Sequence, residues 1–188
     1  MKTLLSIYFT YAQDPIKGMQ MLMERRSFRQ ACLGYLVATL GWVLFFNIGD
    51  QLSIPALLTK ILLVFAAEIT AGFFISALCG LFLDLLRVKV SAAQLFVLIG
   101  SAGFIKALLI AFSLISAAIP QAHLGYFFPL ALLFVLVLQL GYLVAGLRRT
   151  WNVGTAEAIG GWLFAFVPVI VLLGLLGIFF IWFIVLLF

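Results

Sequence analysis

Residues 61–83 read ILLVFAAEITAGFFISALCGLFL, and Glu68 is the single charged residue among them. An α-helix rises about 1.5 Å per residue, so this run is long enough to cross the roughly 30 Å hydrocarbon core of a bilayer. A soluble protein has little use for so long an apolar segment, because it cannot be covered on all sides. The stretch therefore predicts a transmembrane helix.

Four further runs of comparable length and composition occur along the chain. They cover residues 31–49, 95–115, 126–147 and 162–187. Membrane β-strands would show apolar residues alternating with polar ones, and residues 127–138 do not alternate at all, so a barrel is excluded. We expect an all-α, polytopic membrane protein with a cytoplasmic segment at residues 1–30 and a five-helix transmembrane domain at 31–188.

The composition of the whole chain agrees with a membrane protein. Of its 188 residues 66% are hydrophobic and 9% are charged, whereas soluble domains are about half apolar and a quarter charged. The net charge of +5 does not indicate nucleic acid, because the basic residues lie between the apolar runs instead of forming one face. The expected partners are membrane lipids and either further copies of the chain or another membrane protein.

The positions of Lys and Arg predict the orientation. Nine of the eleven lie before the first run, between the second and third, or between the fourth and fifth, and these segments share one side of a five-span protein. Because cytoplasmic segments are enriched in Lys and Arg, we expect a cytoplasmic N-terminus and an outside C-terminus. The nine are Lys2, Lys17, Arg25, Arg26, Arg29, Arg87, Lys89, Arg148 and Arg149.

Residues 1–30, called the preface below, are a segment in which polar residues interrupt the apolar ones. They do not resemble a cleaved signal peptide, so we expect the first span to be retained. Spacing predicts an amphipathic helix, and Asp14 followed by Pro15 predicts the start of a second short helix. Two arrangements are equally open: the preface lies among headgroups, with Arg25, Arg26 and Arg29 contacting anionic lipid, or it packs beneath the bundle. Recruitment of a partner protein is a third.

Two charged residues fall inside the predicted spans. Glu68 and Lys106 are expected at similar depths in antiparallel neighbours, so they are predicted to form an ion pair. Gly72, Ser76 and Gly80 follow Glu68 at intervals of four and predict a small-residue packing ridge. The pair has a structural interpretation, in which it fixes helix register, and a functional one, in which it relays protons or contacts a substrate. Separate snorkelling of the two groups is the third possibility.

Sequence signals for catalysis are missing. No Cys/His cluster has metal-ligand spacing, and no phosphate-binding glycine loop, HExxH or GxSxG motif occurs. We therefore expect neither an enzyme nor a bound metal or cofactor. An odd number of spans also disfavours a transporter built from two inverted repeats.

Several local features together resemble a known family. These are Asp14-Pro15, the basic stretch RRSFR at residues 25–29, five spans, and GYLVAGLRRTWNVGTAEA at residues 141–158. This layout is similar to the Yip family, whose members are named for interaction with Rab-type GTPases, and especially to its compact bacterial branch. The third span departs from that branch, because Lys106 lies in the zone, near residues 104–106, where a mid-helix proline is expected.

The resemblance implies a non-enzymatic protein that organises membranes or holds partner proteins, located in a bacterial cytoplasmic membrane. The alternative, which follows from the residues themselves, is a small transporter or permease subunit that uses Glu68 and Lys106.

Overall fold

The computed structural model describes residues 9–11, 13–25, 27–48, 50, 53–118 and 127–187, and every element assigned in these ranges is helical. The all-α prediction is confirmed. In chain order the elements are α2 (Pro15–Glu24), α3 (Phe28–Phe46), α4 (Ile54–Leu85), α5 (Ala92–Ala102), the 3-10 turn η1 (Gly103–Lys106), α6 (Ala107–Ala118), α7 (Phe127–Trp151) and α8 (Thr155–Leu187).

Five helical segments in the described part of the chain are long and apolar enough to cross a membrane. They are α3, α4, the continuous segment α5–η1–α6, α7 and α8, so the predicted five-span architecture is confirmed. The largest boundary differences are at α4 and α8, which begin seven residues before the predicted Ile61 and Trp162. The α4 start has a clear local cause. It is set by Ser53, whose side chain accepts a bond from the Ala56 amide, and by Pro55 in the first turn.

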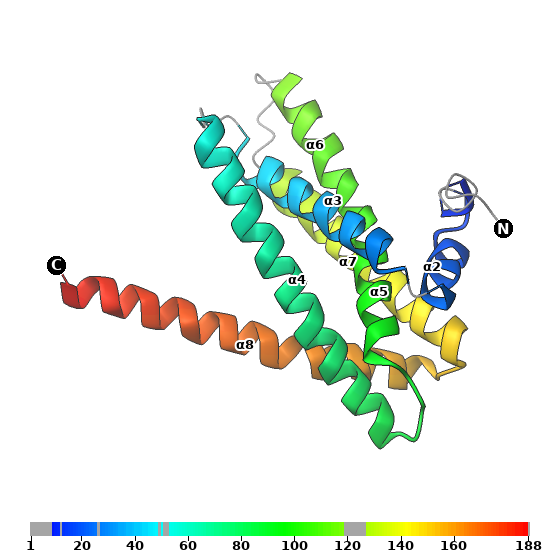
Figure 1. Ribbon diagram of the computed structural model, residues 1–188. Helices are drawn as coiled ribbons and strands as arrows, with labels where there is room; N and C mark the ends of the chain where they lie inside the picture. The colour runs from blue at the N-terminus through cyan, green and yellow to red at the C-terminus, as the bar shows by residue number, and fades with distance from the viewer. Residues whose placement is uncertain are drawn as a thin grey trace.

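The spans are not equally central. α3 and α5–η1–α6 are the most buried, and α4 and α7 pack around them. α8 crosses α4 near the C-terminal part of that helix, where the rings of Phe82 and Phe164 lie 5.5 Å apart. Figure 1 shows the rest of α8 diverging from α4, so that its C-terminal half leaves the bundle.

The short helix α2 begins as predicted, with the Asp14 side chain accepting a bond from the Lys17 amide at 3.1 Å. Met19, Leu22 and Met23 are fully buried, and α2 packs against α5 and α7. This geometry corresponds to packing beneath the bundle, because the apolar face that would enter the headgroup layer is already covered. Residues 1–8, where most of the upstream amphipathic helix was predicted, lie outside the described residues.

Tyr11 ties the preface to the middle of the third span. Its hydroxyl donates to the carbonyl oxygen of Ser101 at 2.7 Å, and its ring packs edge-on against Phe104. Burial is the main cause, and the nearby Tyr142 a smaller one, that raises the pKa of the Tyr11 hydroxyl well above its usual range. The group therefore remains a protonated donor.

Among the described glycine positions, those of α3 make the closest approach to another span, at α5 and η1. A methyl group on Gly34 would lie 1.8 Å from the carbonyl oxygen of Gly100, and one on Gly41 would lie 2.5 Å from that of Lys106. Only a residue without a side chain allows the two backbones to come this close. In an apolar solvent such contact is the main source of helix association, because the hydrophobic effect between helices is absent.

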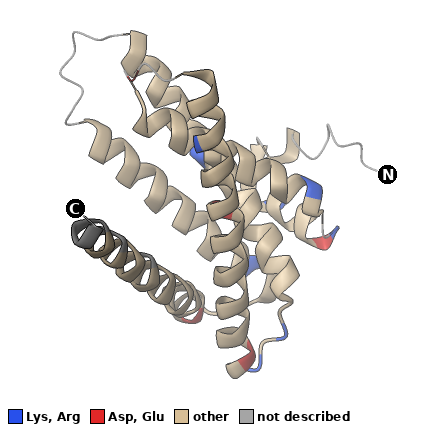
Figure 2. Ribbon diagram, turned by 60° about the vertical axis from the view of Figure 1, so that its left-hand side comes forward, with Lys and Arg blue, Asp and Glu red and all other residues tan. Residues whose placement is uncertain are grey.

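Basic side chains gather at one end of the bundle. Arg87 and Lys89 lie in the connection between α4 and α5, and Arg148 and Arg149 lie in the last turn of α7. In Figure 1 both of these helix ends lie at the lower right, on the same side as α2. Figure 2 shows that charged segments are few and lie mostly at helix ends and in connections. This distribution is the one on which the predicted orientation depends.

The glycine contact gives a first testable prediction. Gly34→Ala is expected to destabilise the protein by about 1 to 3 kcal/mol, because the added methyl group must push α3 away from α5. The measurement is the midpoint of thermal unfolding in mild detergent. Gly141→Ala is the matched control, since a methyl group there meets nothing within 4 Å. Equal midpoints for the two variants would show that α3 and α5 are not in backbone contact.

Candidate functional site

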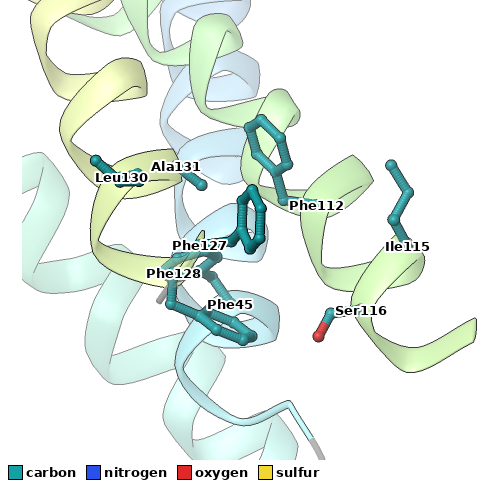
Figure 3. Close-up of a pocket in the computed structure, with 8 residues that line it drawn as sticks. All are labelled: Phe45, Phe112, Ile115, Ser116, Phe127, Phe128, Leu130 and Ala131. Atoms are coloured by element: carbon teal, nitrogen blue, oxygen red, sulfur yellow. The ribbon is translucent and has the colours of Figure 1, made fainter. Parts of the chain in front are cut away.

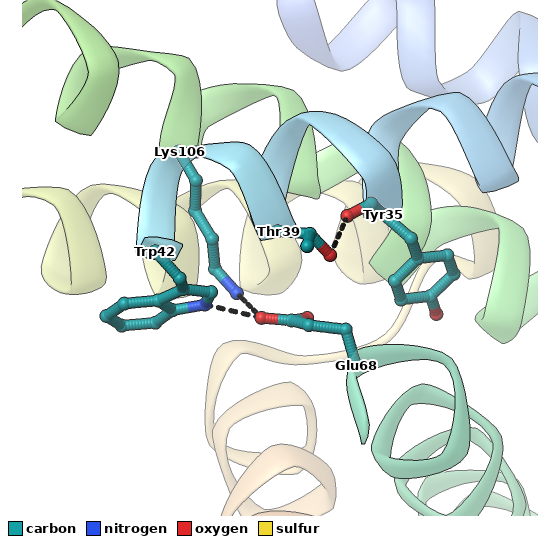
Figure 4. Close-up of polar contacts among 5 residues, drawn as sticks. All are labelled: Tyr35, Thr39, Trp42, Glu68 and Lys106. Atoms are coloured by element: carbon teal, nitrogen blue, oxygen red, sulfur yellow. Dashed lines mark hydrogen bonds and ion pairs between the residues drawn. The ribbon is translucent and has the colours of Figure 1, made fainter. Parts of the chain in front are cut away.

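The structure brings Glu68 and Lys106 together near the middle of the membrane-spanning segments. The ammonium of Lys106 donates to Oε1 of Glu68 at 2.6 Å (Figure 4). Glu68 lies fourteen residues after Ile54, and Lys106 lies twelve residues before Ala118, so the antiparallel spans place both groups at similar depth. The predicted ion pair is present, and it joins α4 to η1.

Trp42 of α3 completes this group. Its indole N–H donates to the same Oε1 of Glu68, and the ammonium of Lys106 lies 4.8 Å from the centroid of its rings. A tryptophan ring attracts a cation over its face while its N–H serves an acceptor at its edge. Figure 4 shows the three side chains converging from three separate segments. We call Trp42, Glu68 and Lys106 the polar cluster.

The side chains of Lys106 and Glu68 are mostly covered by the surrounding helices. The side chain of Lys106 is 7% exposed and that of Glu68 is 19% exposed. Charges in a medium of low polarity are costly by themselves, and removal of one partner from a buried pair costs about 3 to 5 kcal/mol. Here each charge is compensated directly, and Trp42 adds a neutral donor to the carboxylate. The cluster is therefore stable only while α3, α4 and η1 remain together.

The backbone around Lys106 is not a regular α-helix. Gly103–Lys106 forms a 3-10 turn between α5 and α6, and Lys106 is its last residue. The tighter winding of a 3-10 turn changes the angle at which later side chains leave the helix. The same turn places the Lys106 carbonyl oxygen against Gly41 of α3. The helix irregularity and the close contact with α3 thus occur at the residue that carries the charge.

A second contact between spans lies beside the polar cluster. The fully buried Tyr35 of α3 donates its hydroxyl to the carbonyl oxygen of Phe96 in α5 at 3.2 Å. That hydroxyl lies directly over Gly72 of α4, where a methyl group would be 2.2 Å away. The Thr39 hydroxyl donates back to the Tyr35 carbonyl oxygen at 2.9 Å (Figure 4). Tyr35 therefore connects the same three spans as the polar cluster.

The predicted packing ridge lies on the buried side of α4. Gly72, Ser76 and Gly80 are all buried. Gly72 receives Tyr35 of α3, and a methyl group on Gly80 would be 3.6 Å from Leu95 of α5, which is ordinary contact. The ridge thus faces α3 and α5, but the tightest backbone contact is between α3 and α5 themselves.

The three arginines predicted to contact headgroups are not part of this site. Arg25 and Arg29 are exposed where α2 ends and α3 begins, and Arg26 lies outside the described residues. Their position at the basic end of the bundle is compatible with lipid contact, but they are far along the chain from the polar cluster.

Sequence reasoning missed Trp42 and the glycines of α3. Trp42 lies inside an apolar span, where a buried indole N–H needs an acceptor, and Glu68 was the one carboxylate predicted at that depth. Gly34 and Gly41 are seven residues apart, which places them on one face of a helix. Both signals were present, but they identify a partner only when the neighbouring span is known.

The chain was compared with protein-family models, with curated proteins and with solved structures, and none of them matches. The functional argument therefore depends on the fold and on the chemistry of the polar cluster. In that cluster the two charges neutralise one another at hydrogen-bond distance, and the indole N–H of Trp42 also donates to the carboxylate. Such an arrangement is suited to holding helices in register.

The ion pair gives a second prediction. Glu68→Gln is expected to destabilise the protein by about 3 to 5 kcal/mol, because it leaves the buried charge of Lys106 uncompensated. Lys106→Met is expected to destabilise it less, because Glu68 is only half-buried and keeps the hydrogen bond from Trp42. The double variant is expected to regain most of this loss, since neither charge remains. Thermal unfolding of the four proteins in detergent completes a double-mutant cycle. Additive losses in the double variant would mean that the two side chains do not interact.

Proposed function

We propose that this chain is a non-enzymatic integral membrane protein that organises membranes or holds a partner protein, as the resemblance to the Yip family implies. The observation that carries the proposal is the closed polar cluster. Both intramembrane charges are paired with one another at 2.6 Å, and the hydrogen bond from Trp42 adds the third span. On this proposal the protein lies in a bacterial cytoplasmic membrane with its N-terminus and basic end in the cytoplasm.

The arrangement of α8 supports a role in contacts with neighbours. The polar cluster joins three spans through side-chain contacts, whereas the C-terminal half of α8 leaves the bundle (Figure 1). Side chains such as Ile178, Phe179 and Trp182 are more than three-fifths exposed. A bundle joined by such contacts, with a projecting apolar helix, suits attachment to lipid or to another membrane protein.

The third span departs from the family pattern at a place where its helix is irregular. The compact bacterial Yip proteins are expected to carry a mid-helix proline near residues 104–106, and this chain has none there. The helix is nevertheless irregular at that place, where η1 interrupts α5 and α6.

A transporter or permease subunit is the second candidate. One observation favours it: the Glu68 side chain keeps 19% of its surface exposed, although it lies in the middle of its span. An ionisable group at that depth is a common feature of proton and ion paths. On this alternative Lys106 would leave Glu68 during the transport cycle, and η1 would act as the hinge.

Proton flux separates the two candidates. The protein is reconstituted into vesicles containing a trapped pH-sensitive dye, and wild type is compared with the Glu68→Gln/Lys106→Met double variant. Our proposal predicts flux equal to that of protein-free vesicles for both proteins, because the pair is structural. It also predicts that both proteins migrate in the same discrete complex after extraction from native membranes in mild detergent.

One result of the flux measurement would contradict the scaffold proposal. A flux driven by wild type and lost in a double variant that still folds would reject the scaffold proposal and support transport. Thermal unfolding of the double variant serves as the control for folding, so loss of flux cannot be mistaken for loss of structure.

A further inference from the structure

An apolar cavity lies at the end of the bundle opposite the basic end. It is an open pocket between the last turn of α3, the end of α6 and the start of α7, and its volume is about 470 Å³. Figure 3 shows phenylalanine side chains from all three helices around it. The residues that form its wall include Phe45, Phe112, Phe127, Phe128, Ser116 and Ala131.

The chemistry of the wall excludes most ligands. Among the described lining residues Ser116 supplies the one side-chain hydroxyl, and the other described lining side chains are hydrocarbons. A buried water needs two to four polar partners, which this wall does not offer. The volume falls within the range of about 300 to 1,000 Å³ that is common for small-molecule sites. The described part of the wall therefore suits an occupant that is apolar and much larger than a water molecule.

The cavity is continuous with the surface that meets lipid. Ile115, Phe127 and Leu130 line it and are also between 54% and 63% exposed. In a membrane-spanning protein such side chains face the hydrocarbon of the bilayer. Beside these described residues, lipid chains are thus the solvent next to the pocket.

We propose that this cavity binds one acyl chain of a membrane phospholipid. The rings of Phe45 and Phe128 lie 5.2 Å apart and join α3 to α7, so the site has a firm aromatic wall. Phe45 also packs against Phe46, which stacks on Trp42 of the polar cluster. A bound chain fills the space between α3, α6 and α7 and holds these helix ends together. The inference depends on the membrane fold and not on the proposed function.

Photolabelling tests this assignment. The protein is reconstituted into vesicles of phosphatidylethanolamine and phosphatidylglycerol, with a small share of phosphatidylethanolamine that carries a diazirine in the middle of one chain. After illumination, labelled residues are located by mass spectrometry. We expect label on Phe112, Phe128 and Ala131 well above that on Ile178, which is exposed on α8 and serves as the reference for general lipid contact.

Variants that fill the cavity provide the second arm. Ala131→Phe and Ser116→Phe are each expected to lower cavity labelling about tenfold, which corresponds to a loss of about 1.4 kcal/mol in binding. Leu133→Phe is the matched control, because it adds the same ring at a position of α7 that is 58% exposed. It should leave the labelling unchanged.

Two outcomes overturn the proposal. One is wild-type label spread evenly over cavity and reference positions, which would mean either ordinary lipid contact or occupation of the cavity by residues 119–126 of this chain. The other is undiminished cavity labelling in a filled variant that folds. If neither filled variant folds, the wild-type distribution alone decides.

Discussion

The ion pair between Lys106 and Glu68 is the constraint on which the rest of the bundle depends. Neither charge is tolerable alone at the depth where it lies, because hydrocarbon offers no hydration to replace the lost water. Their contact at 2.6 Å removes the problem only if α4 and η1 stay in one register. The pair thus adds little net stability. Its effect is to make every arrangement in which the two charges separate energetically costly.

The remaining features of the core can be understood as conditions for that contact. Gly41 lets the backbone of η1 approach α3, and this approach brings Lys106 over the ring of Trp42. The indole then covers the pair from the α3 side, with its ring toward the ammonium and its N–H toward Glu68. Tyr35 repeats the connection between the same three spans. Close packing and charge compensation therefore support one another.

The peripheral helices are held differently. α8 is attached through contacts with α4 and α7 along its first half and then diverges. The basic connections and α2 gather at one end of the bundle, and the apolar cavity lies at the other. The molecule thus has a centre in which side-chain contacts join three spans, a basic end, and an opposite end with an apolar pocket. These properties suit a protein that works through its contacts with the membrane and with neighbours.

Hydrophobic length was enough to predict the spans, because the bilayer imposes a minimum on every crossing helix. The charges at Glu68 and Lys106 could be paired from sequence because few alternatives exist at that depth. Trp42 and Gly34 could not be assigned in the same way, since their roles depend on which face of α3 meets α5. The docking of α2 was also left open, because its apolar face suits a headgroup layer and a helix bundle equally well. The pocket could not be predicted either, because it depends on how far apart the ends of α3, α6 and α7 lie, and no single sequence pattern indicates that spacing.

The most direct test of the central claim is a solid-state NMR measurement of the dipolar coupling between ¹⁵Nζ of Lys106 and ¹³Cδ of Glu68 in lipid bilayers. With the nitrogen 2.6 Å from Oε1, strong dephasing is predicted, and it should disappear in a Lys106→Met sample. Absence of dephasing in the folded wild type would contradict the account, because the two charges would then be compensated separately.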